Sequence, residues 1–257
     1  MRIQVLTQED AFYIPRILDL LLEHRRDVVG VAVVPGEMRS GNLGRFLRMM
    51  GPRDFLLQGL NLAWHKFLDF VGSFLIPLPS SHSVRGAARL AKVQLEHVPR
   101  VNAPDFLAAL RARGVDLLVS IACPQKLSAE LLAVPRRGAI NLHGALLPRY
   151  QGMFPSFWVL AKGEPETGVT VHWMDEKIDH GDVLLQRTVP ITPEDTVHSL
   201  VLRSKVDVGR HVLLEAIARI EKGDAPRVPM DMARASYFTH PDAAAVREFR
   251  RRGRRFI

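Results

Sequence analysis

Apolar and polar residues follow each other in the first part of the chain with the periods of strands and helices. Residues 1–6 and 28–34 are short apolar runs typical of buried strands, and residues 14–24 repeat apolar positions with the spacing of an amphipathic helix. A strand, a helix and a second strand in this order predict a βαβ unit. This part of the sequence therefore predicts a parallel sheet covered by helices.

The alternation of strand and helix continues as far as residue 223. The pattern predicts strands at 94–98 and 117–121, helices at 103–113, 127–132 and 152–163, and a long helix that starts at Thr192 and ends at Gly223. A short strand and a short helix are expected at 235–238 and 241–250. The fold class predicted is α/β, with a mostly parallel sheet flanked by helices.

Two polar residues interrupt an apolar strand at residues 139–143. Ile140 and Leu142 alternate with Asn141 and His143, so the two polar side chains point to one side with Cα atoms ~7 Å apart. Pro148 and the glycine at 152 follow, which places the pair near the carboxyl end of the strand. Open α/β sheets bind ligands at that end.

An acidic loop joins the next two predicted strands. Residues 168–174 and 183–186 are rich in Val, Thr and Leu, and the loop between them contains Asp179 two residues before Gly181. A hairpin of this length can bring Asp179 back over the strand that holds Asn141 and His143.

Asparagine, histidine and aspartate at a strand end suit the transfer of an acyl group to an amine. Asn141 can donate to a developing oxyanion, His143 can stabilise the tetrahedral intermediate or move a proton, and Asp179 can fix the imidazole tautomer. No serine or cysteine is needed because the amine is the nucleophile. From the residues alone, a structural Asn-x-His pair and a turn aspartate explain the same pattern.

The longer sequence around these residues resembles the 10-formyltetrahydrofolate-dependent formyltransferases. The resemblance rests on NLHGALLPRYQG at residues 141–152, ETGVTVH at 166–172 and DEKIDHGD at 175–182, and it is close over residues 110–190. It implies a Rossmann-like formyltransferase fold and 10-formyltetrahydrofolate as formyl donor. No His/Cys cluster has the spacing of zinc ligands, so no metal is expected. One departure is Ala145, where the family usually has serine.

The resemblance also implies the site residues. The catalytic residues of the family fall on Asn141, His143 and Asp179. The loops that contact folate fall on two segments, which comprise Pro124, Gln125, Lys126 and Leu127, and Asp175, Glu176, Lys177 and Ile178.

Residues 36–79 are expected to form a helical insert. Residues 43–50 and 55–74 are helix-like and rich in Leu and Phe, and Trp64, His65, Lys66 and Asp69 interrupt the apolar run, which disfavours a membrane-spanning helix. The preferred interpretation is a helix that is buried or covers the substrate. A helix on a membrane surface is the alternative.

The last part of the chain, residues 224–257, is expected to be a basic extension of the catalytic domain at 1–223. Its arginines form a solvated face or meet an anionic substrate or membrane surface; they are Arg247, Arg250, Arg251, Arg252, Arg254 and Arg255. With no full second domain after residue 223, methionyl-tRNA formyltransferase is disfavoured as the function, and no stable nucleic-acid partner is expected.

Composition changes this picture only a little. The chain has 257 residues, 47% hydrophobic and 24% charged, with a net charge of +8 and one cysteine, Cys123, which excludes an internal disulfide. No targeting signal or spanning segment is recognised, so a cytoplasmic protein is expected. Residues 7–10 lack a Gly-rich loop, which disfavours dinucleotide binding. His172, His198 and His211 are interpreted as structural.

The expected function is the formylation of a small, anionic amine. The run from Met153 to Trp158 resembles the sugar-amine branch of the family, so a nucleotide-linked amino sugar is the first candidate. The alternatives are a methionyl-tRNA formyltransferase-like enzyme, a formyltetrahydrofolate hydrolase, and a non-catalytic module that binds folate or an anion. A homodimer and a peripheral membrane contact also stay open.

Overall fold

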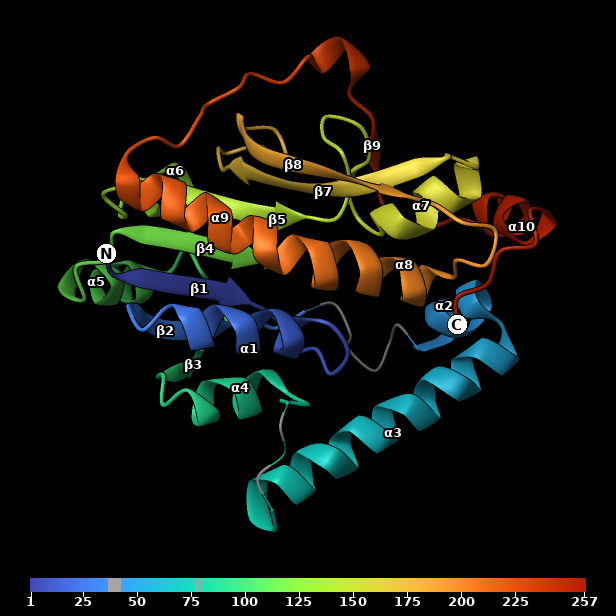
Figure 1. The fold of residues 1–257 in the computed structure, drawn as a ribbon, viewed down its shortest axis with the longest axis horizontal. Helices are drawn as coiled ribbons and strands as arrows, with labels where there is room; N and C mark the ends of the chain where they lie inside the picture. Colours follow the sequence, from blue (N-terminus) through green and yellow to red (C-terminus); the bar gives the residue numbers. More distant parts are fainter. Residues whose placement is uncertain (37–42, 77, 79) are drawn as a thin grey trace.

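A seven-stranded sheet forms the centre of the computed structural model, which describes residues 1–36, 43–76, 78 and 80–257 (Figure 1). The strand order is β3-β2-β1-β4-β5-β7-β8. The first five strands in this order are parallel, whereas β7 is antiparallel to β5 and β8 is antiparallel to β7. This arrangement confirms the α/β prediction. The strands are β1 (Ile3–Thr7), β2 (Val28–Val33), β3 (Leu95–His97), β4 (Leu117–Ile121), β5 (Ala139–His143), β7 (Glu166–Trp173) and β8 (Val183–Pro190).

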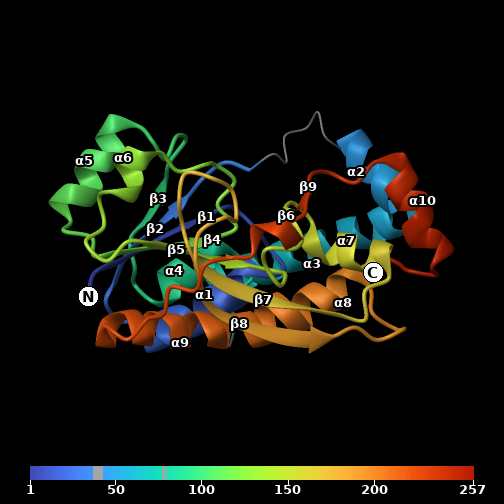
Figure 2. The ribbon, with the colours of Figure 1, turned by 90° about the horizontal axis from the view of Figure 1, so that it is seen from above.

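Helices cover both faces of the sheet (Figure 2). One face is covered by α1, α4 and α9, and the other by α5 and α6. The two helices α1 and α5 begin with Pro at their first turn, where a missing N–H costs nothing. The bounds are α1 (Ile14–His24), α4 (Val84–Leu90), α5 (Pro104–Ala112), α6 (Ala129–Leu132) and α9 (Gly209–Lys222).

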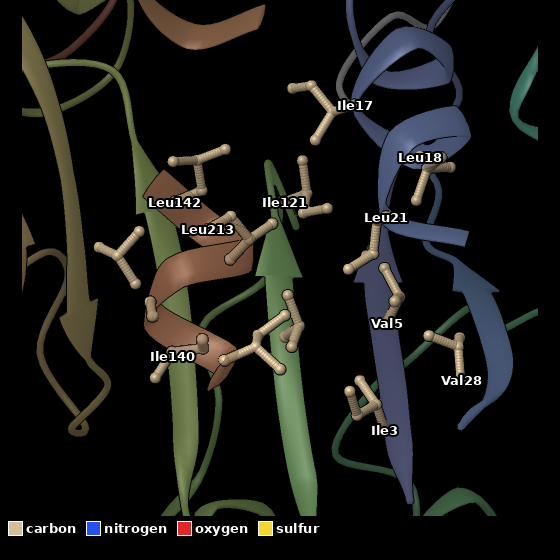
Figure 3. Close-up of a cluster of buried hydrophobic side chains, with 14 of the residues drawn as sticks. Ile3, Val5, Ile17, Leu18, Leu21, Val28, Ile121, Ile140, Leu142 and Leu213 are labelled. Atoms are coloured by element: carbon tan, nitrogen blue, oxygen red, sulfur yellow. The ribbon is translucent and has the colours of Figure 1, made fainter. Parts of the chain in front are cut away.

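The alternation along β5 divides its side chains between the two faces. Ile140 and Leu142 pack in the cluster formed with α1 and α9, where Leu213 of α9 and Ile121 of β4 lie beside them (Figure 3). Ala139 packs on the opposite face, in the cluster with α5 and α6. In a strand every second side chain points to the same face, so Asn141 and His143 point to the same face as Ala139. Burial of Ile140 and Leu142 on the α9 side therefore fixes the direction of both polar side chains.

A third apolar cluster joins the carboxyl-terminal extension to the rest of the molecule. Phe249 of α10 (Ala243–Arg251) stacks on Phe157 of α7 (Pro155–Lys162) with ring centroids 4.8 Å apart. Phe256 stacks on the same ring at 5.7 Å. The extension also supplies β9 (Tyr237–Phe238), which pairs in parallel with β6 (Gln151–Gly152), while Met232–Arg234 forms a 3-10 turn.

Replacing Phe249 by alanine is expected to lower the free energy of unfolding by about 3–5 kcal/mol, because its ring is 0% exposed and a cavity would remain. Urea unfolding of both proteins measures the difference. The matched control is Phe74→Ala, since Phe74 is 75% exposed and its loss should cost little. A loss below about 1 kcal/mol for Phe249→Ala would mean that α10 does not pack as described.

The predicted helical insert forms α2 (Leu43–Met50) and α3 (Pro52–Phe74), and of the two preferred interpretations burial is wrong for α3, whereas covering of the substrate stays a prediction. No residue of α3 is buried, and the helix runs along the outside of the molecule from α2 toward α4 (Figure 1). Within the described residues, no helix combines the length and the apolar character needed to cross a bilayer.

The long helix before Gly223 starts later than predicted. Thr192 does not cap it, because the Asp195 carboxylate accepts the Thr192 N–H at 2.7 Å and closes a turn. Thr196 is the cap instead: its hydroxyl accepts the Ser199 N–H, and α8 (Val197–Val201) follows. The π-helical segment Leu202–Val208 then joins α8 to α9. A π-turn inside a helix often marks a functional region.

Candidate active site

Asp179 meets Asn141 and His143 at the carboxyl end of β5, as the sequence predicted. The Asn141 Nδ2 donates to Asp179 Oδ1 at 3.2 Å, and the His143 Nδ1 lies 3.3 Å from Asp179 Oδ2. Asp179 lies in the loop between β7 and β8, and this hairpin folds back over β5 because β7 pairs with β5 directly. Three side chains from two distant segments thus form one polar cluster.

Hydrogen bonds from Gly152 and Gln151 hold Asp179 in place. The Gly152 N–H donates to Asp179 Oδ2 at 2.9 Å, and the Gln151 side chain donates to the Asp179 carbonyl at 2.8 Å. Asp179 has a left-handed φ of 50°, a conformation that aspartate tolerates better than most residues. Burial alone would raise the pKa of Asp179, but His143, His172 and the Gly152 N–H together hold this pKa far below its usual range. The carboxylate is therefore ionised.

The tautomer of neutral His143 follows from its partners. The Tyr150 carbonyl oxygen lies 2.8 Å from His143 Nε2, and a carbonyl can only accept, so Nε2 carries the hydrogen. Nδ1 is then the unprotonated nitrogen, and it faces Asp179. Burial lowers the pKa of His143 from its ordinary value of 6.5, while the Asp179 carboxylate and the Tyr150 carbonyl raise it. His143 is therefore a neutral base at neutral pH, placed beside a carboxylate that stabilises its protonated form.

His172, which was interpreted as structural, belongs to the same cluster. It pairs with Asn141 across β5 and β7, and its Nε2 lies 3.2 Å from Asn141 Nδ2 and 3.4 Å from Asp179 Oδ1. Its Nδ1 donates to the Trp173 carbonyl at 2.8 Å, and its Nε2 is within reach of both the Asn141 amide and the Asp179 carboxylate. The alternation of Thr170 and His172 with valine and tryptophan in β7 is the signal that could have placed His172 on this face.

Thr170 supports the loop that follows β5. Its hydroxyl donates to the Ala145 carbonyl at 2.6 Å and accepts the Leu147 N–H at 3.1 Å, and Gln186 of β8 donates to the same hydroxyl at 2.9 Å. Ala145 itself is 0% exposed. The alanine at position 145 therefore leaves this loop with side-chain hydrogen bonds, because Thr170 of the neighbouring strand supplies them.

The segment Pro124, Gln125, Lys126 and Leu127 is fixed mainly by the loop after β3. Gln125 Nε2 donates to the Pro99 carbonyl at 2.7 Å, and the Gln125 Oε1 accepts the Val101 N–H at 3.0 Å. The Leu127 side chain is 2% exposed and belongs to the core, whereas Pro124 and Lys126 are exposed. Cys123, just before, is half-buried, and burial raises its pKa to about 11, as expected of an unreactive thiol.

The second predicted loop lies close to Asp179. Asp175 accepts the Lys177 N–H at 2.8 Å and the His180 imidazole at 2.6 Å, while Glu176, Lys177 and Ile178 are exposed. Met174 packs against the same apolar cluster as Leu127. The two predicted folate loops therefore border one end of the same core.

Lys205 is a cation near the cluster that the sequence did not indicate. It lies in the π-helical segment, and the side chain approaches Gly144, which follows His143. Burial lowers the pKa of Lys205, and the carboxylates of Asp10 and Asp179 oppose this shift. Asp10 is itself fixed, since its carboxylate accepts the N–H groups of Tyr13 and Ile14 at the start of α1. The residues around position 205 have the apolar spacing of an ordinary packed helix, so the sequence pattern does not single out Lys205.

The family of formyl transferases, described as "Formyl transferase", matches residues 1–217. The chain belongs to this family. The resemblance stated from the sequence is thereby confirmed, and the polar cluster lies within the matched residues.

Methionyl-tRNA formyltransferases are among the relatives of the chain. The protein of Moorella thermoacetica is 36% identical over 203 residues, 74% of this chain and 64% of its own length. The protein of Synechococcus sp. (strain JA-2-3B'a(2-13)) is 44% identical over 135 residues, 52% of this chain and 41% of its own length. The chain therefore spans about two fifths to two thirds of the length of these relatives.

Solved structures of the formyl transferase family share the fold. A sugar 3N-formyl transferase, solved in the presence of dTDP and 5-N-formyl-THF, has a TM-score of 0.59 at 18% identity and covers 93% of this chain and 69% of its own. Glycinamide ribonucleotide transformylase 1 from Symbiobacterium toebii has a TM-score of 0.58 at 24% identity, with coverages of 87% and 88%. At these identities the likeness concerns the fold alone, and it confirms the predicted formyltransferase-like architecture.

Stability of this formyl transferase family member is expected to fall on mild acidification. Burial lowers the pKa of His65, His82, His143 and His198 below the ordinary value of 6.5. The unfolded chain therefore binds more protons than the folded chain as the pH falls through about 6.5, so acid favours unfolding. The low pKa of Asp179 adds a separate loss of folding stability only below about pH 4.

Urea unfolding at about pH 7.5 and about pH 5.5 measures this effect, with the lower free energy of unfolding expected at the lower pH. His143→Gln removes one of the four groups and should show a smaller decrease. An unchanged or higher free energy of unfolding at the lower pH would contradict the protonation states described.

Proposed function

We propose that this protein is an N-formyltransferase that moves the formyl group of 10-formyltetrahydrofolate to a primary amine. The observation that carries the proposal is the convergence of Asn141, His143 and Asp179, whose polar atoms lie 3.2 and 3.3 Å apart although they come from two separate segments. Membership of the formyl transferase family supports the reaction class. That no metal takes part stays a prediction.

Asn141 acts on the oxygen of the formyl group. Its amide is oriented by Asp179 Oδ1 and His172 Nε2, and one of these hydrogen bonds is exchanged for the oxyanion as the amine attacks. A single preorganised donor of this kind is typically worth about 3 kcal/mol of transition-state stabilisation.

His143 moves the proton. As the new N–C bond forms, His143 Nδ1 takes a proton from the attacking amine, and the Asp179 carboxylate stabilises the imidazolium. When the bond between the formyl carbon and the folate nitrogen breaks, His143 returns that proton to the leaving nitrogen. Asp179 is too acidic to keep the proton itself, so its role is to orient and stabilise His143.

The formyl donor is assigned to the surface between the two predicted folate loops. Leu127 and Met174 anchor these loops on a common apolar cluster, and Asp175 is fixed beside Asp179 by its contacts with Lys177 and His180. A solved relative in the formyl transferase fold contained 5-N-formyl-THF, which supports a reduced formyl-folate as the donor. 10-Formyltetrahydrofolate supplies the transferred one-carbon group.

The acceptor favoured by the sequence relatives is methionyl-tRNA. Those relatives are 36% and 44% identical, whereas a sugar N-formyl transferase is only 18% identical. The relatives thus support methionyl-tRNA as acceptor better than the nucleotide-linked amino sugar that was expected from the run after Met153. They also speak against the expectation that no nucleic acid binds. The net charge of +8 also suits a polyanionic acceptor.

Incubation of the full chain with 10-formyltetrahydrofolate and each acceptor tests the proposal. Tetrahydrofolate release and the mass of the product are measured with methionyl-tRNA, with nucleotide-linked amino sugars and with no acceptor. Release only with methionyl-tRNA, together with N-formylmethionyl-tRNA as product, is expected. Formylation of an amino sugar alone would restore the first acceptor.

The same experiment separates the remaining alternatives. Release without any acceptor would identify a formyltetrahydrofolate hydrolase, in which water replaces the amine. Folate binding without release in any mixture would identify a non-catalytic binding module and would contradict the proposed function.

A further inference from the structure

A continuous row of large apolar side chains lies exposed on α3. Trp64 is 57% exposed, Phe67 54% and Phe70 55%, and the row continues to Phe74 at the end of the helix. Large exposed apolar surfaces are uncommon on soluble proteins and mark sites of interaction with proteins or membranes. The members of the row are Leu56, Leu60, Trp64, Phe67, Phe70 and Phe74, with Leu75 and Ile76 after the helix.

The spacing of these residues places them on one side of α3. Positions 56, 60, 64, 67, 70 and 74 follow each other at intervals of three or four residues, which line a single face of a helix. From residue 56 to residue 74 the row covers 18 helical rises, about 27 Å of helix axis.

Polar contacts on the opposite side of α3 keep the row turned outward. His65 packs edge-on against Phe12 with ring centroids 5.4 Å apart, and its Nδ1 lies 3.2 Å from His82 Nδ1. Asp69 accepts the Ser83 hydroxyl at 2.6 Å. Because these contacts fix the rotation of α3 about its axis, the exposed row is a fixed feature of the fold.

The exposed charges of α2 and α3 all have one sign. The exposed charged residues are basic: Arg45, Arg48, Arg53 and Lys66. The two carboxylates of α3 are not fully exposed, since Asp54 accepts the Phe256 N–H at 3.2 Å and Asp69 bonds Ser83. The apolar row is thus bordered by cations, which complement an anionic surface.

A basic cavity adjoins the amino-terminal end of α3. Its volume is about 270 Å³, and Arg53, Arg250, Arg254 and Arg255 line it together with one carboxylate, Asp54, and apolar side chains such as Phe249. Arg250 and Arg254 are positioned by hydrogen bonds to the Met49 and Thr192 carbonyls. Four guanidinium groups around one cavity suit a phosphate group.

We propose that α3 lies in the surface of a negatively charged lipid bilayer, with its apolar row among the acyl chains and a lipid phosphate in the arginine cavity. An aromatic and aliphatic face bordered by Lys and Arg is the pattern of a helix that lies in the membrane plane. A second copy of the chain fits less well, because it would bring further cations to this face without an exposed carboxylate of α2 or α3 to pair with them.

Flotation of the full chain with lipid vesicles tests the proposal. Vesicles of phosphatidylcholine with about 30% phosphatidylglycerol should bind the protein at least ~10-fold more tightly than phosphatidylcholine alone, and added salt should weaken the binding. The fluorescence of Trp64 should shift to the blue on binding, because its ring leaves water. Equal, absent or salt-independent binding would contradict the proposal.

Matched variants locate the contact. The double variant F67S/F70S should weaken vesicle binding at least ~10-fold, because two aromatic rings that the bilayer would bury are lost. The variant R53Q/R255Q should remove the preference for anionic lipid. V228S is the control, since Val228 is 54% exposed but lies beside β8. Normal binding by F67S/F70S, or a dimer that this variant converts to a monomer without any vesicle binding, would overturn the membrane assignment. Melting temperatures confirm that each variant is folded.

Discussion

Replacement of His143 by alanine is expected to lower the rate constant for formyl transfer by at least ~100-fold, because the reaction loses the base that takes the amine proton. The Nε2 hydrogen bond to the Tyr150 carbonyl fixes the ring so that Nδ1 faces Asp179, and no other described imidazole has this arrangement. The measurement is single-turnover transfer from 10-formyltetrahydrofolate with saturating acceptor, so that binding and chemistry are separated.

The matched control for this variant is His24→Ala. His24 is exposed at the end of α1, and its Nδ1 lies 3.0 Å from the Leu20 carbonyl oxygen of the same helix. Its removal should leave the rate constant within about threefold of the unchanged protein. If His143→Ala retained a near-normal rate, or if both variants lost the same activity, His143 would not be the proton carrier.

Replacement of Asp179 by asparagine is expected to cost at least ~100-fold in the same rate constant. The carboxylate stabilises the His143 imidazolium and accepts hydrogen bonds from Asn141 Nδ2 and the Gly152 N–H. An amide at this position carries no charge and presents N–H groups to some of these donors. The pH at which activity is half-maximal on the acid side should also move downward, because the loss of the carboxylate lowers the pKa of His143.

Asp182→Asn is the control for the second variant. Asp182 lies in the same hairpin, and its backbone carbonyl, which the substitution keeps, accepts the Trp173 N–H at 2.8 Å. A large loss for both aspartates would point to disruption of the loop as a whole. An unchanged acid limb in Asp179→Asn, even with a reduced rate, would contradict the electrostatic coupling of Asp179 to His143.

The sequence predicted the sheet and its polar cluster because local patterns determine both. The alternation of Ile140 and Leu142 with Asn141 and His143 depends only on the period of a strand, and burial of the apolar pair then fixes the polar pair on the other face. The turn residues after Met174 likewise indicate the hairpin that carries Asp179. These features need no knowledge of distant contacts.

Other features could not be predicted, since they depend on contacts between distant residues. The orientation of α3 follows from His65 and Asp69 meeting Phe12 and Ser83, and a helix with so many Leu and Phe residues was expected to be buried or to cover the substrate. The start of α8 depends on the Asp195 side chain, which bonds Thr192 and Arg203 and so prevents an earlier start.

The pairing of β6 with β9 has a consequence for synthesis of the protein. Gly152, which donates to Asp179, has a left-handed φ of 89°, and a Cβ at this position would collide with the Phe238 carbonyl. The Met153 N–H also bonds that carbonyl at 2.8 Å. A nascent polypeptide that has left the ribosome only as far as α9 thus lacks the strand that steadies Gly152. Catalytic competence should appear late in translation, after Phe238 has emerged from the exit tunnel.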